Sequence, residues 1–157
     1  MATQDIYNYI LVNETLSTGG QPTEDQICSA ATEGFTTVIN LATFLPGESL
    51  EDEAGLVRSL GMAYYAIPVE WSSPQHSDFA AFEQVIQMLP AGKTLLHCAA
   101  NFRVTAFYSL YALKHLGWSQ AQVEAFRAHI WEGSDYPVWE QFIDELTRLI
   151  TGKADPE

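Results

Sequence analysis

Short, continuous apolar runs alternate with longer amphipathic segments along this chain, and this alternation constrains its fold more than any other feature. Three runs occupy residues 37–42, 62–69 and 93–98, and they carry the apolar and β-branched residues typical of buried parallel strands. A short edge strand is expected around residues 16–20. Strands that alternate with helices predict an α/β fold with a mostly parallel central sheet flanked by helices on both faces.

The amphipathic segments carry the signals that begin and end helices. Thr23 and Gln26 form a capping-box pattern, and Gly34 is placed to end the helix that follows. Ser119 and Gln122 repeat the capping box. The other helices are expected from about Ser49 to Gly61, from near Ser77, from Arg103 to Gly117, and over residues 136–150 after a turn at residues 132–135. We expect the late helices to stack at one side of the sheet, packed through Trp118, Trp131 and Trp139.

Length and charge limit the classes of protein to consider. The chain has 157 residues, 47% of them hydrophobic, which favours one domain over residues 1–157 with a core at about residues 16–150. No apolar run approaches the ~18 residues of a membrane span. The N-terminus lacks the basic region of a secretory signal, so a cytoplasmic location is expected. A net charge of −13 argues against nucleic acid or an anionic membrane as a partner, and leaves the oligomeric state open.

The two cysteines, Cys28 and Cys98, are not spaced like the ligands of a metal knuckle or the pair of a redox motif. We therefore expect no metal, no cofactor and a reduced chain. Cys28 lies on an apolar helix face and is expected in the core. Cys98 ends the third apolar run, and its simplest interpretation is also that of a small buried hydrophobe.

A second interpretation of Cys98 comes from the stretch around it, which reads LLHCAANFRVTAF from residue 95 to residue 107. Ligands of parallel sheets bind beyond the carboxyl ends of the strands, where Cys98 is placed. The backbone amides of the residues between Cys98 and Arg103 and the start of the next helix favour an anion, including a thiolate. Arg103 opposes the helix dipole unless an anion binds there, and its guanidinium is suited to two oxygens of a tetrahedral oxyanion. The stretch thus predicts a nucleophile and an anion cradle together.

This arrangement resembles the active-site loop of the cysteine-dependent protein tyrosine phosphatase superfamily, and the order of elements resembles its small dual-specificity branch. A closer resemblance is to a bacterial family of phosphatase-like proteins related to the N-terminal part of the beta-lactamase-hydrolase-like proteins. Three stretches carry it: STGGQPTEDQ, GFTTVINL and HCAANFRVTA. The resemblance implies a dual-specificity-phosphatase-like fold and a phosphorylated small molecule or phosphoprotein as substrate. It also implies that Cys98 forms a phosphocysteine and that Arg103 clamps the phosphate, with the loop residues Ala99, Ala100, Asn101 and Phe102 around it.

The loop departs from the superfamily pattern in three ways. Four residues separate Cys98 from Arg103, where most tyrosine phosphatases have five. Asn101 replaces the usual glycine, although asparagine tolerates the left-handed conformation. The position directly after the arginine, where the superfamily usually has a hydroxyl residue, is Val104. Thr105, the next residue, is therefore placed to assist the leaving thiolate instead. For His97 two roles stay open, one as a residue that orients the loop and tunes the thiol, the other as a strand-end histidine bonded to neighbouring backbone.

Phosphate-ester cleavage also needs an acid that protonates the leaving oxygen. The resemblance places it on the loop PVEWSSPQHSD, which offers Glu70, His76 and Asp78. Glu70 lies beside the expected place, whereas Asp78 sits in the first turn of a helix, where compensation of the dipole is its simpler role. An exposed loop carboxylate is the simpler role for Glu70, and His76 is expected in solvent. The acidic residues 44–53 are expected to form a solvated loop and helix start that could border the site and favour basic substrates.

Three functions therefore stay open. The first is a cysteine-dependent phosphomonoester hydrolase of the tyrosine or dual-specificity type. The second is a rhodanese-like sulfurtransferase or persulfide carrier, because the four-residue loop matches the loop length of that class. The third is a catalytically weak, anion-binding regulatory module, because no acid is firmly identified.

Overall fold

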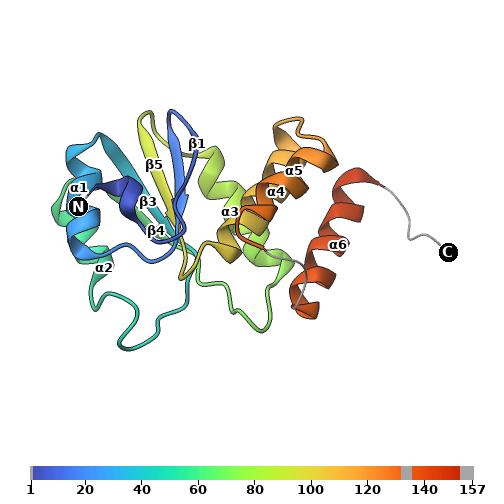
Figure 1. Cartoon of the computed structure of the whole chain (residues 1–157), viewed down its shortest axis with the longest axis horizontal. Helices are drawn as coiled ribbons and strands as arrows, with labels where there is room; N and C mark the ends of the chain where they lie inside the picture. The colour runs from blue at the N-terminus through green and yellow to red at the C-terminus, as the bar shows by residue number, and fades with distance from the viewer. Residues whose placement is uncertain (1, 132–135, 153–157) are drawn as a thin grey trace.

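The computed structural model describes residues 2–131 and 136–152 and contains a five-stranded sheet in the order β1-β2-β5-β3-β4 (Figure 1). The strands are β1 (Ile10–Asn13), β2 (Leu16–Gly19), β3 (Phe35–Asn40), β4 (Ala63–Ala66) and β5 (Lys93–His97). All neighbours are parallel except β1 and β2. The prediction of an α/β fold with a mostly parallel sheet is confirmed.

The expected edge strand at residues 16–20 lies inside the sheet, so its placement at the edge was wrong. β1 pairs with the outer side of β2 and forms the edge instead. β1 is four residues long, alternates between half-buried and exposed positions, and pairs with residues only a few positions away in a hairpin. Such a short, half-exposed segment gives too weak a pattern for prediction.

Helices cover both faces of the sheet (Figure 1). One face carries a 3-10 turn, η1 (Thr3–Asp5), with α1 (Glu24–Thr32) and α2 (Glu53–Ser59), packed through residues such as Ile27, Val57 and Leu95. The other face carries α3 (His76–Gln87), α4 (Phe102–His115), α5 (Gln120–Ala128) and α6 (Pro137–Thr151). α5 and α6 pack against α4, which confirms that the late helices stack at one side. None of the helices in the described ranges is long and apolar enough to cross a membrane.

The tryptophans pack these late helices as expected. Trp139 is fully buried, Trp118 contacts Tyr108 and Phe126, and the Trp131 ring stacks with that of Trp71 at 6.0 Å between centroids. Cys28 departs from expectation because it is only half-buried, and both cysteines are free.

Local hydrogen bonds explain where the helices begin. Both predicted capping boxes form, at Thr23 with Gln26 and at Ser119 with Gln122. α2 begins at Glu53, not near Ser49, because the Asp52 side chain accepts the Gly55 N–H at 3.0 Å and caps the helix there. α3 begins at His76, one residue before the predicted start. The turn predicted at residues 132–135 lies outside the described residues.

Strand register brings distant residues to one edge of the sheet. Gly19 of β2 and Asn40 of β3 both pair with His97, and Asn40 also pairs with Ala66 of β4. The loops that follow these four strand ends therefore meet at the same edge, and they project below the sheet in Figure 1. Cys98 lies there, directly after β5.

Candidate active site

The loop from Cys98 to Arg103 is anchored to the segment that follows β2. The Cys98 N–H donates to the carbonyl of Gly19 at 3.3 Å, and the Gln21 N–H donates to the carbonyl of Ala99 at 2.9 Å. A Cβ atom on Gly20 would lie 2.7 Å from the Ala99 carbonyl oxygen, closer than real side chains approach. The glycines of the stretch STGGQP therefore let the two backbones approach closely enough for these hydrogen bonds to hold the Cys98 loop.

Asn101 fixes the sharp turn into α4. Its φ of 71° lies in the left-handed region, which confirms the expectation for the residue that replaces glycine. The side chain is fully buried, and its Nδ2 donates to the Asn8 carbonyl at 2.8 Å and to Thr18 Oγ1 at 3.0 Å. Asn8 in turn donates to the carbonyl of Ala100 at 3.0 Å. The turn is thus held by side chains from the β1 and β2 region.

Arg103 is a buried cation with no anionic partner among the residues that the structure describes. It is 7% exposed, and its Nε has no hydrogen-bond partner within the described ranges. Among the described residues, no ion pair involves Arg103. The Trp71 ring covers it, with 5.6 Å between the guanidinium carbon and the ring centroid. A buried charge without a counter-ion is costly, so this arrangement favours a bound anion.

Cys98 is 1% exposed and starts the loop that leads to Arg103. Thr105, the candidate for assisting the thiolate, lies buried beneath the loop. Its hydroxyl is within 2.8 Å of the Asn101 carbonyl, and it accepts the Trp131 indole N–H at 3.1 Å. The Thr105 hydroxyl thus braces the turn, and its assistance to the thiolate stays a prediction.

His97 shares a buried hydrogen bond with Glu53 that the sequence did not indicate. Its Nε2 lies 2.6 Å from Glu53 Oε2, and its Nδ1 lies 3.1 Å from the carbonyl oxygen of Cys98. His97 is fully buried and Glu53 is 6% exposed. A carboxylate and a carbonyl both accept hydrogen bonds, so the two ring nitrogens of His97 each face an acceptor. The backbone contact expected of a strand-end histidine is present, and the role of His97 in orienting the loop and tuning the thiol stays a prediction.

Glu53 overturns the expectation that residues 44–53 are all solvated. Burial raises the pKa of Glu53, but the hydrogen bond and charge of His97, with a 2.8 Å hydrogen bond from Gln21, outweigh it, so the pKa lies below its ordinary value. Burial and the nearby Glu53 charge raise the pKa of Tyr64 to about 12. Tyr64 and Glu53 are thus a neutral phenol and a carboxylate. No sequence signal relates Glu53 to His97, since 44 positions separate them.

The candidate acids lie on the loop between β4 and α3. Glu70 is exposed and directly precedes Trp71, the residue that covers Arg103. Asp78 accepts the Gln75 N–H at 3.0 Å and so caps α3, in agreement with its simpler role. His76 is exposed, as expected, and its Nε2 lies 3.1 Å from Glu145 Oε2 of α6. The structure brings the Glu70 loop to the site, and the identity of the acid stays a prediction.

Aromatic contacts hold this loop in place. The Trp139 indole N–H donates to the Trp71 carbonyl at 2.7 Å. The Trp71 ring also packs on Phe102, Trp131 and Trp139, with 5.9, 6.0 and 5.2 Å between centroids. The cover over Arg103 is therefore fixed by the late helices.

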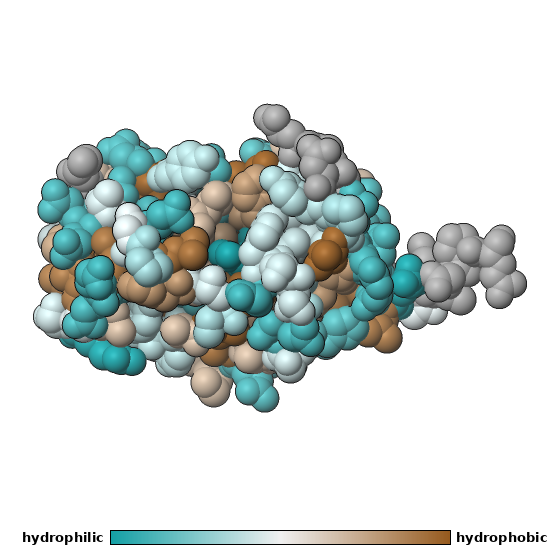
Figure 2. All heavy atoms as spheres, turned by 90° about the horizontal axis from the view of Figure 1, so that it is seen from below, coloured by the Kyte–Doolittle hydropathy of each residue, from teal (hydrophilic) through white to brown (hydrophobic). Residues whose placement is uncertain are grey.

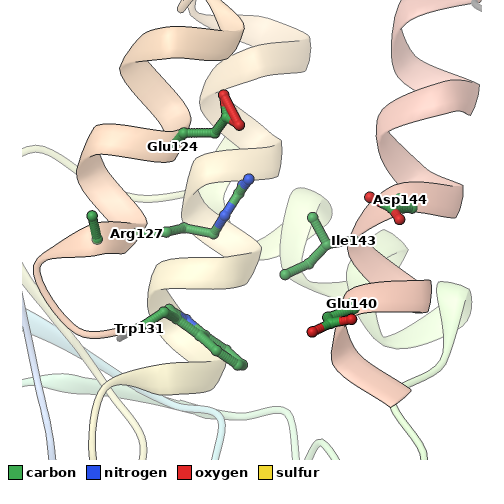
Figure 3. Close-up of a pocket in the computed structure, with 7 residues that line it drawn as sticks. Glu124, Arg127, Trp131, Glu140, Ile143 and Asp144 are labelled. Carbon is green, nitrogen blue, oxygen red and sulfur yellow. The ribbon is translucent and has the colours of Figure 1, made fainter. Parts of the chain in front are cut away.

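A separate cavity of about 480 Å³ lies between α5 and α6 (Figure 3). Figure 3 shows Arg127 between Glu124 and Trp131, facing Ile143 and Glu140 across the gap. Burial lowers the pKa of Arg127, whereas the charges of Glu124 and Asp144 raise it. Arg127 also donates to Ser109 Oγ at 2.9 Å. Because this arginine has partners within the protein, the cavity is a weaker anion site than the loop at Arg103.

Comparison with known proteins gives three similarities, although no protein-family profile matches the sequence. The chain is 29% identical over 151 residues to the beta-lactamase hydrolase-like protein of Xylella fastidiosa, covering 92% of this chain and 34% of that protein. The chain thus spans about a third of the length of this curated relative.

Two solved structures have similar folds. A "Putative phosphatase (DUF442)" from Shewanella putrefaciens has 31% identity and a TM-score of 0.83, with 94% of this chain and 95% of that chain covered. TpbA of P. aeruginosa, solved with phosphotyrosine, has 14% identity and a TM-score of 0.70, with 93% and 91% covered. At this lower identity the second likeness shows the fold alone.

Proposed function

This chain belongs to the bacterial DUF442 family of phosphatase-like proteins, and from that premise we propose that it is a cysteine-dependent phosphomonoester hydrolase. One observation carries the proposal. Arg103 is a buried cation whose Nε has no partner in the described part of the chain, and it ends the loop that begins with the buried thiol of Cys98. A tetrahedral phosphate supplies both the missing charge and the missing acceptor, and it brings phosphorus to the sulfur.

In the proposed reaction the Cys98 thiolate attacks phosphorus and forms a phosphocysteine. The bond to the leaving oxygen breaks, and an acid donates a proton to that oxygen. Water then attacks the phosphocysteine, gives its proton to the same acid group, and releases inorganic phosphate and the thiolate. Arg103 and the amides of Ala99 and Ala100 hold the non-bridging oxygens through both steps. His97 contacts the Cys98 carbonyl through Nδ1, and a protonated His97 ring would favour the thiolate.

Glu70 is the acid that the geometry supports better. It lies on the loop that covers Arg103, and its carboxylate makes no hydrogen bond to another described residue. Asp78 uses its carboxylate to cap α3. We therefore assign the proton of the leaving group to Glu70, with Asp78 as the alternative.

Hydrolysis of p-nitrophenyl phosphate between pH 5 and 8 tests the proposal. Cys98→Ser is expected to lower turnover at least ~10³-fold and to retain phosphate binding, because the loop amides and Arg103 remain. Cys28→Ser is a matched control, since that thiol is free, half-buried and on α1. Turnover that survives Cys98→Ser, or a well-folded protein that binds phosphate without turnover, would refute a cysteine-dependent hydrolase.

Sulfur transfer is the second candidate because one observation favours it, the four-residue spacing between Cys98 and Arg103. In that case thiosulfate would transfer a sulfur atom to the Cys98 thiolate and leave as sulfite. The mass of the intact protein after incubation with thiosulfate decides, since a persulfide adds one sulfur atom. A Cys98-dependent gain of sulfur without phosphatase turnover would favour this candidate.

A further inference from the structure

We infer that the groove beside the Cys98 loop selects a phosphopeptide segment in which a basic side chain neighbours the phosphorylated residue. This inference rests on the proposed function and names its substrate class. The groove contains a cavity of about 650 Å³ that reaches the loop at Ala99 and Ala100. The organic part of a phosphoester held by the loop amides therefore has this cavity beside it.

The groove continues along the connection between β3 and α2. A second cavity of about 280 Å³ shares four lining residues with the first, Ala42, Thr43, Ser49 and Leu50. Figure 2 looks onto this edge from below and shows apolar and hydrophilic atoms side by side over the half of the molecule that holds α1 and α2. The two cavities therefore adjoin along this connection, next to the loop at Ala99 and Ala100.

The charge of the groove has one sign. Glu24 and Glu48 line the larger cavity, and Glu51 lines the smaller one. These three side chains are exposed, and none of them is in an ion pair among the described residues. Of the described residues, no lysine, arginine or histidine lines either cavity. Arg103 can therefore neutralise one phosphate. A second anionic group in the groove would be repelled by these carboxylates.

The walls between these carboxylates are partly apolar. Tyr7 is 64% exposed and Leu45 is 44% exposed, and both line the larger cavity with Pro22. Lysine and arginine side chains bury an apolar stem and keep a charged end in water. Such a side chain matches a surface of this kind, with its stem on Tyr7 or Leu45 and its charge near Glu24 or Glu48. A neutral or acidic side chain lacks the positive charge that would pair with these carboxylates.

Two phosphotyrosine peptides that differ only in a lysine or a glutamate next to the phosphorylated residue test the inference. At low ionic strength kcat/KM is expected to be about tenfold higher for the lysine peptide, and the ratio should fall as salt screens exposed charges. Glu24→Gln and Glu48→Gln should each reduce the ratio about threefold. Glu14→Gln is the matched control, because Glu14 is exposed in the turn between β1 and β2, at the other end of the strands from the Cys98 loop. This variant should leave the ratio unchanged.

The same experiment separates failure of the inference from failure of the proposed function. Equal turnover of both peptides, or a preference for the glutamate peptide, with normal hydrolysis of p-nitrophenyl phosphate, overturns the inference alone. If Glu14→Gln reduces the ratio as much as Glu24→Gln and Glu48→Gln do, the preference comes from the net charge of the protein, and the inference about the groove is overturned. Efficient hydrolysis of small phosphate esters with neither peptide cleaved points to a small-molecule substrate and rejects the peptide. Absence of turnover on every probe overturns the proposed function and the inference with it.

Discussion

At the residue scale, the buried contact between Glu53 and His97 bears on the reactivity of Cys98. Glu53→Gln keeps a side chain of the same shape but removes the carboxylate charge at Nε2, and that charge favours a protonated His97 ring. We expect alkylation of Cys98 by iodoacetamide at pH 6 to slow about tenfold, the factor that corresponds to ~1.4 kcal/mol. The measurement is the pH dependence of the alkylation rate, with Glu14→Gln as the control. A lower melting temperature with an unchanged pH profile would make the pair purely structural.

The assignment of Glu70 as the acid makes a different prediction at the same scale. A leaving group such as p-nitrophenolate needs little protonation, whereas an alkyl alcohol needs a full proton. Glu70→Gln is therefore expected to lower kcat for an alkyl phosphate about 10²-fold and for p-nitrophenyl phosphate much less. Asp78→Asn serves as the comparison, since it weakens the α3 cap. Equal losses on both substrates would remove Glu70 from this role.

At the scale of elements, the contact between the β2 connection and the Cys98 loop decides whether the loop keeps its shape. Gly20→Ala would place a Cβ 2.7 Å from the Ala99 carbonyl oxygen, so the two backbones must separate. We expect weaker phosphate binding and a loss of ~1–3 kcal/mol in the free energy of unfolding. Gly61→Ala is the control, because its φ of +84° is strained but no atom lies within 4 Å of the added Cβ. Calorimetric titration with phosphate should separate the two variants, and equal phosphate affinities would show that the loop tolerates the shift.

Elements were predictable where the signal is local and elusive where it is not. The capping boxes at Thr23 and Ser119 and the Cys98 loop are contained within a few residues, and all were found. The start of α2 was placed four residues early, because Ser49 and Asp52 are both good caps and only the folded chain chooses between them. The partnership of Glu53 with His97 arises from register between β3, β5 and the start of α2, which no local pattern contains.

At the scale of the whole molecule, two of the many acidic residues, Glu53 and Glu83, stabilise the fold, one on each face of the sheet. Burial raises the pKa of Glu83, but the hydrogen bonds and charges of His115 and Lys114 outweigh it, so the pKa is lowered, as it is for Glu53. Glu53 lies on α2 and Glu83 on α3, on opposite faces. Because both belong to one domain in our interpretation, a single unfolding transition should respond to both.

The sign of the pH effect follows from the direction of these shifts. A carboxyl group whose pKa is lower in the folded protein binds a proton more tightly in the unfolded chain. Acid therefore favours unfolding. The contributions of Glu53 and Glu83 are complete above the ordinary glutamate pKa of 4.5 and are lost as the pH falls through the lower folded values. Urea unfolding of the wild type should therefore show one transition whose free energy decreases from pH 6 to pH 3. Glu53→Gln and Glu83→Gln should each be less stable than the wild type at pH 6 and approach it at pH 3, whereas parallel curves or two separate transitions would contradict this account.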